Sequence, residues 1–93
     1  MIRSFADKRT AAIFMEQPAR GIGESLARAA KRKLDLLHAA SRVEDLSSPP
    51  GNRLEKLRGD RAGQWSIRVN DQWRICFGWD GIDAVEVALV DYH

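Results

Sequence analysis

Apolar and polar side chains alternate in residues 1–5, and this pattern predicts a short strand at the start of the chain. A helix is expected next, since apolar residues then recur at helical spacing. Its apolar stripe comprises Ala11, Phe14 and Met15. Asp7 is placed to cap the amino end of this helix, and Pro18 ends it because proline supplies no amide hydrogen.

A longer helix is predicted from Glu24 to about Ala40, after a loop that contains two glycines. Its apolar stripe comprises Leu26, Ala30, Leu34 and Leu37. The charged residues Arg28, Lys31, Arg32 and Asp35 lie elsewhere around this helix. Such a stripe is typical of a helix that packs on a core, so we assign no chemistry to it.

The segment 47–51, Ser-Ser-Pro-Pro-Gly, ends the helical part of the chain, because two prolines fix φ and remove backbone donors. Three runs with strand character follow, at residues 64–70, 72–79 and 83–90. Tight turns are predicted at Asn70-Asp71 and at Asp80-Gly81, the second of which favours a type I′ turn. Residues 52–57 also alternate and either add an edge strand or lead into the sheet.

The alternation also predicts which side chains face the helices. The inward set comprises Trp65, Ile67 and Val69 in the first run and Trp73, Ile75 and Phe77 in the second, and the opposite set comprises Ser66, Arg68, Arg74 and Cys76. The sequence therefore predicts an α+β fold with two N-terminal helices packed on one face of a small antiparallel sheet. Residues 1–93 are enough for a single domain.

Composition narrows the class of protein. With 44% hydrophobic and 30% charged residues, the chain is expected to be globular. Cys76 is the single cysteine, so no internal disulfide can form, and with His38 and His93 it makes no zinc-binding spacing. We expect no metal. No stretch resembles a signal peptide or approaches the ~18 apolar residues of a membrane span, so a cytoplasmic protein without a membrane partner is predicted.

Positive charge is unevenly distributed. Residues 1–42 hold nine Lys/Arg against four Asp/Glu, whereas residues 43–93 hold six against nine. The basic residues of the second part all precede the acidic group Asp80, Asp83, Glu86 and Asp91, and they are Arg53, Lys56, Arg58, Arg61, Arg68 and Arg74. This stretch is either a surface that faces phosphates or an ordinary solvated surface.

Several of these residues suggest chemistry. Arg68 and Arg74 are expected to be neighbours on the uncovered face of the sheet, where they either bind phosphate oxygens or remain solvated or paired with Glu86. Glu55 lies among cations and is either a proton acceptor or a member of a surface ion pair. Residues 91–93 place a carboxylate, a phenol and an imidazole directly after the last strand.

Four strings, in this order, carry a resemblance to a known family. They are Pro49-Pro-Gly-Asn-Arg-Leu-Glu, Leu57-Arg-Gly-Asp-Arg, Trp65-Ser-Ile-Arg-Val-Asn-Asp-Gln-Trp-Arg-Ile-Cys-Phe and Val90-Asp-Tyr-His. Together with the order of elements, they resemble the HigB-type toxins, the plasmid maintenance system killer family of the RelE/ParE superfamily. The resemblance covers essentially the whole chain and is strongest over residues 48–93. It implies a RelE-like fold and a type II toxin that is a ribosome-dependent endoribonuclease and needs no metal or other cofactor.

The resemblance also implies a site. The family's lysine before Gly-Asp falls on Arg58, its strand arginine on Arg74, and its terminal Asp-Tyr on Asp91 and Tyr92. One departure is important: where some HigB toxins have a histidine three residues before that lysine, this chain has Glu55. His93 supplies another imidazole, but nothing in the sequence shows that it substitutes. Catalysis is therefore expected to be weak.

Cleavage of RNA without a metal needs a base for the 2′-hydroxyl, cations for the phosphate and an acid for the leaving oxygen. We expect Arg58 and Arg74 to stabilise the phosphate, and either Glu55 or Tyr92 to act as the base. Asp91 and His93 would orient or assist. The residues expected to bind RNA are Arg53, Lys56, Arg61 and Arg68.

The resemblance implies partners as well: messenger RNA on the ribosome, ribosomal RNA, and a helix-turn-helix antitoxin of the HigA kind. DNA would be contacted only indirectly, through that antitoxin. Residues 31–33 of the long helix, Lys-Arg-Lys, either contact ribosomal RNA or form a solvated face. Two alternatives remain open. One is a ParE-like poison of DNA gyrase, against which the retained Arg58, Arg74 and Tyr92 weigh, and the other is a ribosome-binding module that does not cleave.

Overall fold

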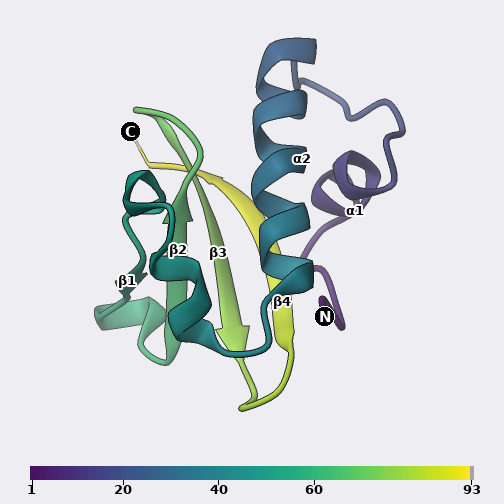
Figure 1. Ribbon diagram of the computed structural model, residues 1–93. Helices are drawn as coiled ribbons and strands as arrows, with labels where there is room; N and C mark the ends of the chain where they lie inside the picture. Colours follow the sequence, from purple (N-terminus) through teal and green to yellow (C-terminus); the bar gives the residue numbers. More distant parts are fainter. Residues whose placement is uncertain (93) are drawn as a thin grey trace.

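The computed structural model describes residues 1–92. Two helices, α1 (Lys8–Phe14) and α2 (Glu24–Ala39), precede a four-stranded antiparallel sheet. Its strands lie in sequence order: β1 (Glu55–Lys56), β2 (Gln64–Arg68), β3 (Trp73–Trp79) and β4 (Ala84–Asp91). Short 3-10 helices η1 (Val43–Ser47), η2 (Pro50–Asn52) and η3 (Gly59–Arg61) connect these elements. The predicted α+β class is confirmed, and α2 crosses one face of the sheet with α1 beside it (Figure 1).

The predicted helices form where the sequence indicates them. Asp7 caps α1, since its Oδ1 accepts a hydrogen bond of 2.7 Å from the amide of Thr10. α1 ends at Phe14, earlier than the expected stop at Pro18, and Glu16 follows with a left-handed φ of 58°. Among the described residues, no helix is both long enough and apolar enough to cross a membrane.

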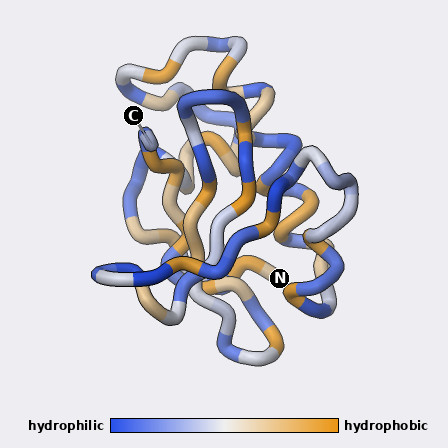
Figure 2. Tube along the Cα trace, turned by 90° about the vertical axis from the view of Figure 1, so that its left-hand side faces the viewer, coloured by the Kyte–Doolittle hydropathy of each residue, from blue (hydrophilic) through white to orange (hydrophobic). Residues whose placement is uncertain are grey.

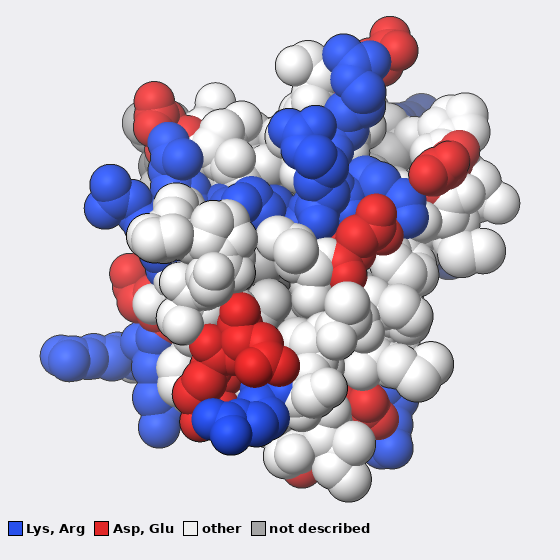
Figure 3. Space-filling model, in the orientation of Figure 1, with Lys and Arg blue, Asp and Glu red and all other residues white. Residues whose placement is uncertain are grey.

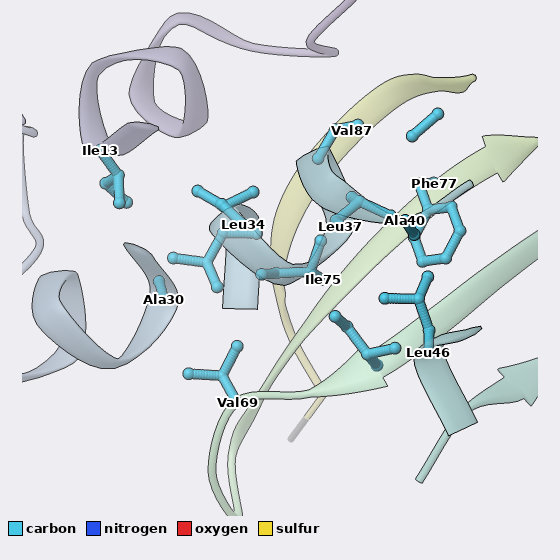
Figure 4. Packing of buried hydrophobic residues seen from close by; sticks show 13 residues of the cluster. Ile13, Ala30, Leu34, Leu37, Ala40, Leu46, Val69, Ile75, Phe77 and Val87 are labelled. Carbon is cyan, nitrogen blue, oxygen red and sulfur yellow. The ribbon is translucent and has the colours of Figure 1, made fainter. Parts of the chain in front are cut away.

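The core lies between α2 and the sheet. Leu34 and Leu37 of α2 pack against Ile75 and Phe77 of β3 and Val87 of β4, and all five side chains are fully buried (Figure 4). Burial of each such side chain stabilises the fold by roughly 1.5–3 kcal/mol. Hydrophobic and hydrophilic positions accordingly alternate along much of the chain (Figure 2). The inward assignment of the alternating strand residues is confirmed.

The amino-terminal segment differs from the predicted strand. It makes two isolated parallel bridges to the free edge of β4, pairing Ile2 with Ala84 and Phe5 with Val87. Between these bridges Glu86 adopts a φ of 53°, and its amide donates to Ser4 Oγ at 2.9 Å. The segment therefore covers the β4 edge without forming a regular strand.

The segment before the sheet is mostly irregular. Of the run 52–57, only Glu55–Lys56 forms a strand, and it lies at the edge. Asn52 is buried in η2, where its amide group donates to the carbonyls of Leu46 and Ser48 at 3.1 and 3.3 Å. Arg53 follows with a left-handed φ of 46°, which redirects the chain toward β1.

The turn between β3 and β4 differs from the predicted dipeptide. The prediction of a type I′ turn at Asp80-Gly81 is wrong, because the Asp80 amide donates to the Asp83 carbonyl at 3.1 Å and the turn centres one residue later. Gly81 takes the positive φ of 99°, which favours glycine. In the other loop, Asn70 Oδ1 accepts hydrogen bonds from the amides of Gln72 and Trp73, both at 2.8 Å.

Candidate functional site

One row of side chains crosses the sheet on the face away from the helices. The strand register places Glu55 of β1 opposite Ser66 of β2, Ser66 opposite Cys76 of β3, and Cys76 opposite Ala88 of β4. Ser66 and Cys76 are fully buried, although this face was expected to be open. The sequence therefore predicts the face of these residues correctly but not their burial.

The covering side chains are Arg74 and Tyr92. Arg74 Nε donates to Ser66 Oγ at 2.8 Å, and Cys76 Sγ donates to Tyr92 Oη at 3.9 Å. The Arg74 guanidinium carbon lies 5.7 Å from the centroid of the Tyr92 ring. An arginine at this distance interacts with the π electrons of the ring, so the two side chains support each other over the row.

The Arg74 guanidinium is held in a fixed orientation. Besides the bond to Ser66 Oγ, it donates from Nη2 to the carbonyl of Arg53 at 2.6 Å and to the carbonyl of Ser66 at 3.4 Å. The left-handed turn at Arg53 brings that carbonyl to the strand. None of the ion pairs within residues 1–92 includes Arg74, so its expected alternative, a pair with Glu86, does not form.

Tyr92 stands at the end of β4 with 44% of its surface exposed. Its amide donates to the carbonyl of Gln72 at 2.8 Å, which fixes the backbone beside the β2–β3 hairpin. Partial burial, the charge of Cys76 and a hydrogen bond with Cys76 raise the pKa of the phenol, and hydrogen bonding with Ser66 and the charge of Arg74 lower it less. The phenol is therefore neutral near pH 7 and able to donate a proton.

Two charged residues from the edge of the sheet approach the same row. Burial is the largest of the effects on the Cys76 thiol and raises its pKa. Glu55 and Arg61 are both near enough to Cys76 to influence this pKa as well. Arg61 also donates to Gln64 Oε1 at 3.1 Å. Glu55 is exposed and belongs to none of the ion pairs in residues 1–92. A carboxylate and a guanidinium thus border the row beside Arg74.

Other expected site residues lie elsewhere. Lys56 is opposite Trp65, and its Nζ lies 5.7 Å from the Trp65 ring centroid, so it follows the inward set rather than the site. Asp91 is opposite Trp73 on the side of the strand away from Tyr92, and it accepts a hydrogen bond of 3.0 Å from Gln72 Nε2.

Arg58 is less closely connected to the row. Arg58 is exposed at the start of η3, and in the part of the chain that the structure describes no hydrogen bond or ion pair joins its side chain to Arg74 or Tyr92. His93 lies outside the described residues. Within residues 1–92, no three potential metal ligands come together.

A basic band, formed by Arg32 and Lys33 of α2 and Arg68 of β2, extends from this end of the sheet onto α2. Burial and the nearby charges of Arg32 and Arg68 lower the pKa of Lys33, and its Nζ donates to Asn52 Oδ1. Figure 3 shows lysine and arginine side chains gathered over the upper part of this face. The sequence separates Lys33 from Arg68 by more than thirty positions, so no local pattern indicated that these charges meet.

Ser66 and Cys76 were not expected to belong to the site. A small polar side chain in the middle of a strand that otherwise carries large residues is the signal that indicates such a position. Ser66 Oγ accepts a hydrogen bond from Arg74 Nε, and Ser66 is near enough to Tyr92 to lower the pKa of its phenol. The arrangement provides a fixed cation, a neutral phenol and a nearby carboxylate, the three kinds of group that phosphodiester cleavage without a metal requires.

Comparisons with known proteins identify the family of the chain. Residues 3–93 match the family described as RelE-like toxin of type II toxin-antitoxin system HigB. The chain is 31% identical to the protein named Endoribonuclease HigB of Proteus vulgaris over 93 residues, which cover all of both chains. It is 50% identical over 62 residues to the protein named Toxin HigB-1 of Vibrio cholerae, a segment that spans 66% of this chain and 65% of the relative. The chain therefore belongs to the HigB-like family of RelE-like toxins from type II toxin-antitoxin systems.

Proposed function

We propose that this toxin cleaves messenger RNA on the ribosome as a metal-independent endoribonuclease. The observation that carries the proposal is the Arg74 guanidinium, which is held by Ser66 and the Arg53 carbonyl, has no carboxylate partner within residues 1–92, and lies against Tyr92. Because arginine retains its proton and binds phosphate oxygens through a planar fork, it suits a scissile phosphate. The name of the Proteus relative supports the same activity.

The chemistry follows from the groups beside Arg74. Glu55 takes the proton of the 2′-hydroxyl, the 2′-oxygen attacks the adjacent phosphorus, and the bond from phosphorus to the 5′-oxygen breaks. The neutral phenol of Tyr92 gives its proton to that leaving oxygen, and Arg74 stabilises the charge on the phosphate. The products carry a 2′,3′-cyclic phosphate and a 5′-hydroxyl. Of the two bases expected from the sequence, the raised pKa of Tyr92 favours Glu55.

The remaining site residues have supporting roles in this proposal. Arg58, Arg61 and Arg68 bind the RNA backbone on either side of the cleaved bond, and the exposed side chain of Arg53 extends this surface. Lys56 contributes only to the overall positive charge that attracts RNA, because it lies on the opposite face of the sheet. Asp91 assists from the end of β4, where it binds Gln72 on the side away from Tyr92, and His93 keeps the assisting role that the sequence suggests.

A type II toxin has an antitoxin partner. We propose that this antitoxin is a helix-turn-helix protein of the HigA kind, that it connects the toxin to DNA, and that the toxin acts in the cytoplasm, where translating ribosomes are found. The basic band around Lys33 and Arg68 supports contact with ribosomal RNA, since it concentrates positive charge beside the site.

Induced expression followed by primer extension tests this function. The same transcript is compared with an intact and with a mutated start codon, and supercoiling by DNA gyrase is assayed in parallel. Cuts that appear only in the translated transcript are expected. Uncut transcripts together with inhibited gyrase would favour the ParE-like alternative, and growth arrest with neither effect would favour a binding module.

A further inference from the structure

Ser66 occupies an unusual position for a serine. It lies in the middle of β2, its side chain is fully buried, and both neighbours in its row, Glu55 and Cys76, belong to other strands. Serine has no preference for strands, and burial of a hydroxyl costs free energy unless the hydroxyl is hydrogen-bonded. The position therefore requires an explanation in terms of what the hydroxyl bonds.

The Ser66 hydroxyl bonds Arg74 and lies near Tyr92. It accepts a hydrogen bond from Arg74 Nε at 2.8 Å. Ser66 is also near enough to Tyr92 to lower the pKa of the phenol. A hydroxyl carries one donor and two acceptor lone pairs, so both interactions can be made at once.

The bond to Nε fixes the orientation of the whole guanidinium. Nε and Nη2 are occupied by Ser66 and by the Arg53 carbonyl. Because the guanidinium is planar, these bonds on one edge determine where its remaining donors point. An arginine without them would keep its charge but lose its orientation, and small misplacement of a catalytic group lowers the rate strongly.

We infer that Ser66 is a positioning residue of the proposed reaction, whose hydroxyl holds the Arg74 guanidinium in place against the Tyr92 ring and beneath the bound phosphate. This inference rests on the proposed function for its kinetic consequence. Its structural part stands separately, because Tyr92 is the single tyrosine of the chain and its ionisation can be followed by ultraviolet absorbance in the free protein.

The titration of Tyr92 is compared in the wild type, Ser66→Ala and Cys76→Ala. The groups that act on the phenol are Ser66 of β2 and Cys76 and Arg74 of β3, and the charges of Glu55 of β1 and Arg61 of η3 act on Cys76. Loss of the Ser66 hydroxyl should raise the pKa of Tyr92, whereas Cys76→Ala, a matched change in the same row, should lower it. An unchanged titration in folded Ser66→Ala would overturn the inference.

Single-turnover cleavage on ribosomes that carry a defined messenger RNA gives the kinetic readout. Ser66→Ala should lower the rate at saturation about tenfold with KM nearly unchanged, Ser66→Thr should restore it, and Ser4→Ala should behave as wild type. In an Arg74→Lys background, which lacks Nε, Ser66→Ala should have no further effect. A further tenfold loss there would contradict the inference. If the wild type itself does not cleave, the proposed nuclease function fails, while the Tyr92 titration still decides the role of Ser66.

Discussion

Arg68 and Arg74 face each other directly across the β2–β3 hairpin, yet within residues 1–92 only Arg68 has an acidic partner, the carboxylate of Asp71. Like charges in opposed positions destabilise a sheet, and the pairing with Asp71 reduces this cost. Arg74 is instead oriented by a hydroxyl and two backbone carbonyls, which leave its charge uncompensated. The hairpin thus keeps one cation available for an anion.

Asp71 should limit the affinity of the protein for RNA, because it neutralises part of the charge beside Arg74. Asp71→Asn should tighten binding of a short single-stranded RNA about twofold to threefold and should steepen its salt dependence by about one charge. Fluorescence anisotropy between 50 and 200 mM salt measures both. Asp80→Asn, the same change in charge in the other hairpin, should leave them nearly unchanged. Equal effects of the two substitutions would show that net charge alone governs binding.

The cleaved RNA should end in a 2′,3′-cyclic phosphate, because the proposed base acts on the neighbouring 2′-hydroxyl. Mass spectrometry of a cleaved oligonucleotide identifies this end, and a substrate with 2′-deoxyribose at the cut position should resist cleavage. A free 3′-hydroxyl would rule out the mechanism. Such an end forms when water, and not the 2′-oxygen, attacks the phosphorus and the bond to the 3′-oxygen breaks.

Cys76 should react slowly with thiol reagents in the native protein, since burial raises the pKa of its thiol and Tyr92 covers it. Tyr92→Ala should increase the rate of modification by Ellman's reagent at pH 8 about tenfold, because it removes that cover. Tyr92→Phe keeps the ring and should react almost as slowly as the wild type. A fast reaction in the wild type would show that the row is not covered in solution.

Stability should depend on Asp80 in acid. Hydrogen bonds from the amides of Asp83 and Ile82 lower the pKa of this carboxyl in the folded state. Its contribution is therefore present above the ordinary pKa of an aspartate, about 3.9, and is lost as the pH falls through the lower folded value. The difference in Tm between wild type and Asp80→Asn should be largest near neutral pH and should shrink as the pH falls below the ordinary pKa of an aspartate. A difference that does not change with pH would contradict this assignment.

The sequence predicts the parts of this fold that depend on local pattern. Periodicity identifies α2 and the two central strands, and Asp7 is correctly predicted as a helix cap. The predicted position of the turn at Asp80-Gly81 is wrong by one residue. Asp80 Oδ1 accepts hydrogen bonds from the amides of Ile82 and Asp83, and dipeptide preferences do not account for such side-chain bonds.

The site depends on contacts between distant segments and is therefore predicted less completely. Arg74 and Tyr92 are expected members, but the burial of Ser66 arises only when the end of β4 and the turn at Arg53 reach the same row. The position of Lys56 on the opposite face depends on the register of a two-residue strand, which no periodicity can determine.

The central claim is that Arg74 stabilises the scissile phosphate. Its most direct test is the single-turnover rate of messenger RNA cleavage by Arg74→Ala on programmed ribosomes, with Arg28→Ala, an equal change of charge on α2, as the control. Loss of one such stabilising group lowers a rate about 10²–10³-fold, so we expect a decrease of that size for Arg74→Ala and a nearly normal rate for Arg28→Ala. Cleavage by folded Arg74→Ala at the wild-type rate would contradict the account.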